Sequence, residues 1–108
     1  MTSVLTVAAS VAILIHRELD DDYVGLWVLP WHIRRALPDA SDDQVRTVAT
    51  AVLEALVAGD TALGTLDEYT GSFEPWVTGE TVGYAMSAWR ALGRDPNLGE
   101  VAWLARTS

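Results

Sequence analysis

Few residues of this chain have the types and spacing that catalysis or metal binding requires. The two histidines, His16 and His32, are too far apart to form a ligand pair on one helix. The chain has no Cys, which excludes thiolate catalysis, disulfides and cysteine-based zinc sites. Ser41 is better explained as a helix cap than as a nucleophile. The sequence therefore predicts no catalytic, cofactor-binding or metal-ligating residue, and we expect that the protein is not an enzyme.

The acidic clusters also have simple structural explanations. Asp67 and Glu68 are adjacent acids in a polar loop, where such residues are usually solvated. Residues 20–22 (Asp-Asp-Asp) separate two helical segments, and Asp22 is expected to cap the second of them. A calcium loop would need further oxygen ligands at fixed offsets and a turn glycine, which are missing here.

Tryptophan is the residue type that most favours a binding role. Five Trp in 108 residues are more than a core of this size readily covers, and Trp is a preferred interface anchor. Trp89 falls on the apolar stripe of a predicted helix and is assigned to the core. The candidate interface residues are Trp27, Trp31 and Trp76.

The net charge restricts the class of partner. Fifteen Asp and Glu oppose seven Arg, with no Lys, which gives a net charge of −8. Phosphate-bearing partners would be repelled, so nucleic acid is disfavoured and no anionic membrane surface is expected as a partner. The balance favours a basic protein partner.

The first fifteen residues carry no charged side chain. No basic residue precedes this apolar run, no small-residue cleavage site follows it, and it is too short to span a bilayer. Val4, Val7, Val11 and Leu14 recur at helical spacing. This predicts a core helix rather than a targeting segment, and a cytoplasmic protein.

The rest of the chain alternates helical patterns with a hairpin pattern. The expected order has helices over Ser3–Leu19 and over Tyr23–Leu37, the second with a kink or a break near Leu29 caused by Pro30. Two further helices are expected, from the Ser41 cap to a left-handed stop at Gly59 and from the Thr78 cap to Gly93. Strands are expected over residues 61–66, 73–76 and 101–106. This predicts one α+β domain over residues 1–108, mainly α, with four helices and a small antiparallel sheet.

A hairpin directly after the third helix gives this chain a winged-helix-like order. Residues 23–27 (Tyr-Val-Gly-Leu-Trp) and 93–103 (Gly-Arg-Asp-Pro-Asn-Leu-Gly-Glu-Val-Ala-Trp) carry the resemblance. The chain resembles winged-helix-like domains and small, uncharacterised actinobacterial proteins. The resemblance implies a fold and brings no catalytic residue.

Three functions follow as hypotheses. The first is a non-catalytic acidic protein–protein interaction module, regulatory or immunity-like, which binds a second copy of itself as a homodimer or a basic protein such as a nuclease toxin that it neutralises. The alternative is a winged-helix DNA-binding transcriptional regulator that uses Arg34, Arg35 and Arg46. A ligand-binding or catalytic domain would need a concave apolar pocket with converging polar groups.

Overall fold

The computed structural model describes residues 4–77 and 79–107. Over these residues the chain forms four helices and a four-stranded antiparallel sheet, which confirms the α+β, mainly α, class. The elements, in chain order, are α1 (Val4–Glu18), β1 (Val24–Gly25), α2 (Val28–Ala36), α3 (Asp42–Ala58), β2 (Thr61–Leu66), β3 (Phe73–Pro75), α4 (Thr81–Leu92) and β4 (Trp103–Arg106).

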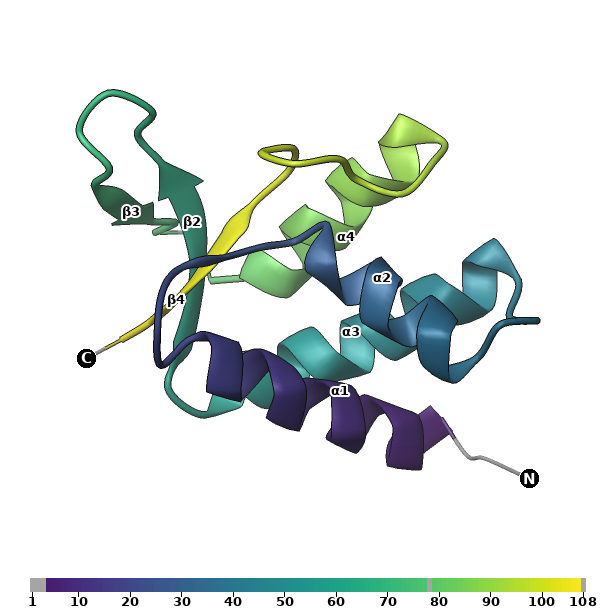
Figure 1. Ribbon diagram of the computed structural model, residues 1–108. Coiled ribbons are helices and arrows are strands. Elements are labelled where there is room, and N and C mark those ends of the chain that lie inside the picture. The colour runs from purple at the N-terminus through teal and green to yellow at the C-terminus, as the bar shows by residue number, and fades with distance from the viewer. Residues whose placement is uncertain (1–3, 78, 108) are drawn as a thin grey trace.

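The sheet has the strand order β1-β4-β2-β3, and the helices lie to one side of it (Figure 1). Leu104 of β4 pairs with Val24 of β1 and with Leu63 of β2, and all three side chains are buried in the core. Successive side chains of a strand point to opposite faces. Trp103 therefore points to the outer face of the sheet, where its paired residues on both sides are glycines, Gly25 and Gly64.

Helix α3 agrees best with the sequence prediction. The predicted apolar stripe is buried throughout and consists of Val45, Val48, Ala49, Val52, Leu53 and Leu56. The Ser41 hydroxyl accepts a hydrogen bond from the Gln44 N–H at 3.1 Å, and the Gln44 side chain accepts one from the Ser41 N–H at 2.8 Å. This capping box satisfies two amides at the start of the helix. The prediction that Gly59 ends the helix in a left-handed conformation was wrong. Gly59 has φ −94° and ψ −116° and leads directly towards β2.

Helix α1 packs against α3 through Val7, Ala8, Val11 and Ile15. The predicted stripe is wrong at its two ends, because Val4 and Leu14 are 43% and 42% exposed. The expected start at Ser3 lies outside the described residues. Within residues 4–77 and 79–107, no helix has the length and apolar character to cross a membrane.

The second predicted helix is the largest correction. Val24 and Gly25 form β1 against β4, and α2 begins only at Val28. Pro30 therefore lies in the first turn of α2, where its missing N–H leaves no helical bond unmade and its fixed φ suits the helix. The chain starts a new helix at this point instead of kinking a longer one, and the sheet gains a fourth strand.

The C-terminal elements are shorter than predicted. Strand β3 ends at Pro75, although the Trp76 N–H still donates to the Leu63 carbonyl at 3.0 Å. Strand β4 begins at Trp103, because Val101 has a positive φ of 68° that breaks the extended backbone. The predicted Thr78 cap of α4 lies outside the described residues. Gly93, with φ 71°, is the left-handed C-cap of α4, so the predicted helix end is confirmed.

Candidate functional site

A groove of about 390 Å³ opens where the end of α1, strand β1, the start of α2 and the α4–β4 loop meet. Its lining combines aromatic, apolar and acidic side chains. The lining residues are Glu18, Asp21, Asp22, Tyr23, Val24, Gly25, Trp27, Val28, Leu98 and Trp103. We call this site the acidic–aromatic groove.

Gly25 sets the position of the aromatic walls. A β-carbon built on Gly25 would lie 2.6 Å from Cδ1 and Nε1 of Trp27 and 3.5 Å from Cζ3 of Trp103. Only glycine lets the Trp27 indole lie this close to the strand backbone without a steric clash. Trp27 is nevertheless 37% exposed, so part of its surface faces solvent. The groove therefore presents indole surface that no side chain on β1 covers.

Three carboxylates from the end of α1 and the following turn give the groove its charge. The Glu18 carboxylate lies 3.6 Å from the His32 imidazole. The Asp22 carboxylate accepts a hydrogen bond from the Tyr23 N–H at 2.7 Å. Neither Asp21 nor Asp22 has an ion-pair partner within residues 4–77 and 79–107. Their charge is available to a ligand.

The α4–β4 loop, which contributes Leu98 to the groove lining, is held by a salt bridge. Both carboxylate oxygens of Glu100 accept hydrogen bonds from Arg94, at 2.7 and 2.8 Å, and one also accepts from the Asn97 N–H at 2.7 Å. The Arg94 guanidinium, and then the Asn97 N–H, lower the pKa of Glu100 to about 2. The loop is thus fixed by a charged group that stays ionised over the physiological range.

Aromatic side chains continue beyond the groove across the outer face of the sheet. Tyr23 stacks on Phe73 with ring centroids 5.7 Å apart. A β-carbon built on Gly64 would lie 2.7 Å from the Phe73 ring, so this ring also lies over a glycine. The outer face therefore offers apolar surface that a bound polypeptide could cover.

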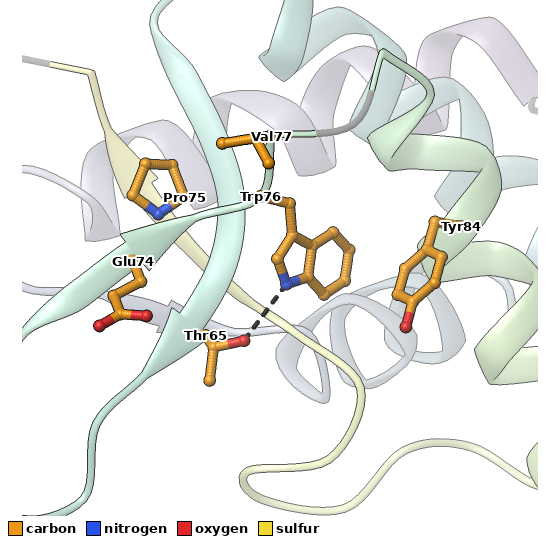
Figure 2. A pocket seen from close by; sticks show the side chains of 6 residues that line it. All are labelled: Thr65, Glu74, Pro75, Trp76, Val77 and Tyr84. Atoms are coloured by element: carbon orange, nitrogen blue, oxygen red, sulfur yellow. Dashed lines mark hydrogen bonds between the residues drawn. The ribbon is translucent and has the colours of Figure 1, made fainter.

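The structure separates the three tryptophans predicted as interface residues. Only Trp27 lines the acidic–aromatic groove. Trp31 is 51% exposed, but the Arg35 guanidinium lies 4.6 Å from its ring centroid. Trp76 lines a different hollow of about 470 Å³, where its Nε1 donates to the Thr65 hydroxyl at 3.2 Å (Figure 2). There it is half-buried and packs edge-to-face on Tyr84 at 4.8 Å.

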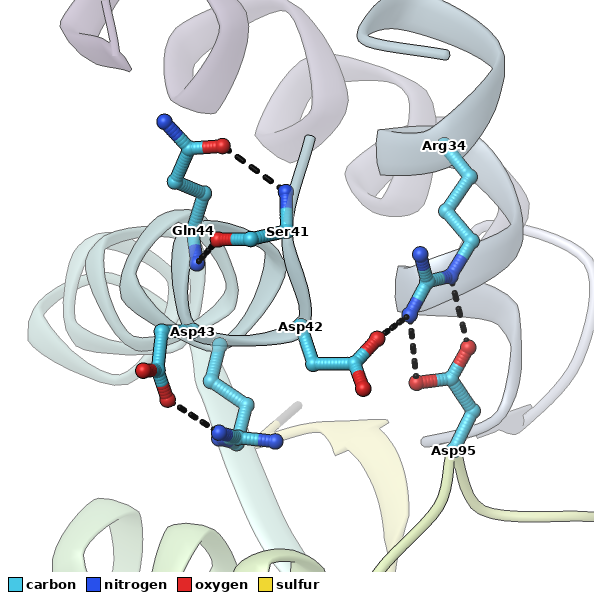
Figure 3. Close-up of polar contacts among 7 residues, drawn as sticks. Arg34, Ser41, Asp42, Asp43, Gln44 and Asp95 are labelled. Carbon is cyan, nitrogen blue, oxygen red and sulfur yellow. Dashed lines mark hydrogen bonds and ion pairs between the residues drawn. The ribbon is translucent and has the colours of Figure 1, made fainter. Parts of the chain in front are cut away.

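The three arginines predicted for nucleic-acid contact all meet partners within the chain. Arg34 donates to both oxygens of Asp95, at 2.8 and 3.1 Å, and to Asp42 at 2.9 Å (Figure 3). These bonds raise the pKa of Arg34 above its ordinary value. Arg46 pairs with Asp43, in the first turn of α3. With Arg35 placed over Trp31, the start of α3 presents paired charges instead of a basic surface.

The two histidines lie near different carboxylates, His16 near Asp60 and His32 near Glu18. His16 lies 3.0 Å from Asp60 and contacts Arg106, which pairs in turn with Asp20. In the part of the chain that the structure describes, no group of three or more His, Asp or Glu side chains has the arrangement of a metal site.

Sequence reasoning missed Trp103 and Gly25 as groove residues, and it treated Asp21 and Asp22 only as a solvated turn and cap. Trp103 and Leu104 are consecutive in the alternating segment from Ala102 to Ala105, so their side chains point to opposite faces of a strand. This alternation could have indicated that the Trp103 indole faces outward. Gly25 was hidden because its segment fitted a helical pattern.

The comparisons with known proteins add no functional information. No protein-family model, curated protein or solved structure shows a significant match to this chain. The function must therefore be argued from the groove itself.

Proposed function

We propose that this protein is a non-catalytic interaction module that binds a basic protein partner through the acidic–aromatic groove. One observation carries the proposal: Asp21 and Asp22 lie unpaired beside exposed indole surface. Most arginines, in contrast, are neutralised within the fold. Those in ion pairs are Arg34, Arg46, Arg94 and Arg106.

The combination of charge and aromatic surface suits recognition of a basic surface. Opposite charge steers a basic partner towards the site and accelerates association. A buried tryptophan at the centre of an interface then supplies much of the binding energy, because its large apolar surface leaves water. The net charge of −8 also repels other acidic proteins, and this repulsion favours selectivity for a basic partner.

A charge-matched pair of double variants tests the proposal. Asp21→Asn with Asp22→Asn removes two charges at the groove, and Glu54→Gln with Glu68→Gln removes two exposed charges elsewhere. Calorimetric titration with an octa-arginine peptide should show about tenfold weaker binding for the groove variant and a smaller loss for the control. Equal losses in the two variants would show that only the overall charge matters and would refute the groove as the site.

A cytoplasmic location accords with this role and with the cysteine-free sequence. We propose the cytoplasmic location together with the function. We also propose that the partner is a different protein and not a second copy of this chain.

A further inference from the structure

We infer that the acidic–aromatic groove receives an arginine side chain of the partner, with its guanidinium against Trp27 and within reach of the groove carboxylates. This inference rests on the proposed function and specifies which partner residue the groove recognises. It concerns a protein side chain and not a free cationic metabolite.

The aromatic geometry is the first reason. A guanidinium is planar and binds well over the face of an indole, where the electrostatic attraction of the ring adds to apolar contact. The Trp27 indole lies against Gly25 on one side and remains partly open to solvent. Trp103 adds a second indole to the lining.

The chain itself contains the same kind of contact at another position. The Arg35 guanidinium lies 4.6 Å from the centroid of the Trp31 ring. Within the described residues, Trp31 therefore has its cation supplied internally, whereas no arginine of the chain lines the groove beside Trp27. The groove has the aromatic surface and lacks the cation.

The carboxylates are the second reason, and they favour arginine over lysine. A guanidinium stacked on a ring can still donate N–H groups along its edge to acceptors at the side. Glu18, Asp21 and Asp22 provide such acceptors around the same cavity. A lysine ammonium is a compact, strongly hydrated charge that gains less from stacking.

The neighbouring surface favours a polypeptide as the source of the arginine. The stacked pair of Tyr23 and Phe73 extends the aromatic surface away from the groove across the sheet. A free amino acid would leave this surface uncovered, whereas residues flanking an arginine in a peptide could pack on it. The partner segment should therefore carry arginine next to apolar residues.

The test uses capped pentapeptides in which a central arginine, lysine or citrulline is flanked by leucine and glycine. Citrulline has the shape of arginine without its charge. The indole N–H resonances of the ¹⁵N-labelled protein report where each peptide binds. We expect the arginine peptide to shift the Trp27 and Trp103 signals and to bind about tenfold more tightly than the citrulline peptide. The lysine peptide should lie between them.

Variants then locate the contact. Trp27→Ala should weaken binding of the arginine peptide about tenfold, and Trp27→Phe should restore part of it because the ring face returns. Gly25→Ala should also weaken binding, since its methyl group displaces the Trp27 ring without changing any charge. Trp31→Ala is the matched control and should bind as the unaltered protein does.

Three results would overturn the inference. The first is equal binding of the arginine and citrulline peptides, and the second is equal binding of free arginine and the arginine peptide. The third is unchanged binding by folded Gly25→Ala and Trp27→Ala variants, together with unshifted Trp27 signals in the unaltered protein. If octa-arginine still bound in a manner that depended on Asp21 and Asp22, the proposed function would survive this failure. If it did not, both proposals would fall.

Discussion

At the scale of single residues, two glycines determine the outer face of the sheet. Gly25 and Gly64 flank Trp103 across the strands, and each lies under an aromatic ring, Trp27 or Phe73. Neither glycine has a positive φ, so each is required for the space that it leaves and not for its backbone conformation. The aromatic surface beside the carboxylates depends on these two missing side chains.

Gly64→Ala should therefore destabilise the fold. The added β-carbon would lie 2.2 Å from the Glu74 carbonyl oxygen and 2.7 Å from the Phe73 ring, which forces β2 and β3 apart. We expect a loss of about 2 kcal/mol in the free energy of unfolding, measured by urea denaturation. Gly79→Ala is the control, because a β-carbon there has no neighbour within 4 Å. A loss as large in the control as in Gly64→Ala would contradict this explanation.

At the scale of elements, the sequence predicted those helices and strands that are determined by residues close to one another along the chain. The α3 stripe and its capping box depend on residues within the helix, and both were predicted correctly. Strand β1 was missed because residues 24 and 25 become a strand only by pairing with β4, far along the chain. The same limit applies to the groove, since Asp21 and Trp103 meet only after folding. Trp27 was a candidate on its residue type, and it lines the groove, but its role in an interface stays a prediction.

The cap of α3 gives a prediction at this scale. Ser41→Ala removes the acceptor for the Gln44 N–H and should lower the free energy of unfolding by about 1 kcal/mol. Thermal and urea denaturation would measure the change. Ser87→Ala, on an exposed position within α4, is the matched control and should leave stability nearly unchanged. An equal effect of the two substitutions would argue against the capping role.

The α4–β4 loop should make stability depend on acid pH. The pKa of Glu100 is about 2 in the folded protein against an ordinary value of 4.5, so its pairing stabilises the fold fully above the ordinary value. This contribution should be lost progressively as the pH falls from about 4.5 to about 2. Urea midpoints over that range should fall less steeply for Glu100→Gln than for the unaltered protein. Glu68 is an exposed loop residue, so in Glu68→Gln the urea midpoint should fall with pH as steeply as in the unaltered protein. If the midpoint of Glu100→Gln also fell as steeply, the stabilising role of Glu100 would be refuted.

At the scale of the whole molecule, the arrangement of charge separates the two candidate functions. The DNA-binding alternative would use α3 as its reading helix, but Asp42 and Asp43 occupy the first turn of α3 and engage Arg34 and Arg46. Unpaired acids lie instead at the groove, beside exposed indole surface. This arrangement of charge supports the proposal of a basic partner over the DNA-binding alternative.

This distribution predicts no measurable binding of a short DNA duplex at low salt. Phosphate binding requires a positive surface, and the arginines at the end of α2 and in α3 already have acidic or aromatic partners. Fluorescence anisotropy of a labelled duplex is the measurement. Binding that weakens steeply as salt is added, and that Arg34→Ala or Arg46→Ala abolishes, would support the DNA-binding alternative instead.

The most direct test of the central claim is to map the binding site of octa-arginine by backbone amide chemical shifts of the ¹⁵N-labelled protein. We predict that the largest shifts cluster in residues 18–28 and 98–103, which line or flank the groove. Shifts of equal size at all exposed acidic positions, or a cluster at the start of α3, would contradict the proposal that the acidic–aromatic groove is the recognition site.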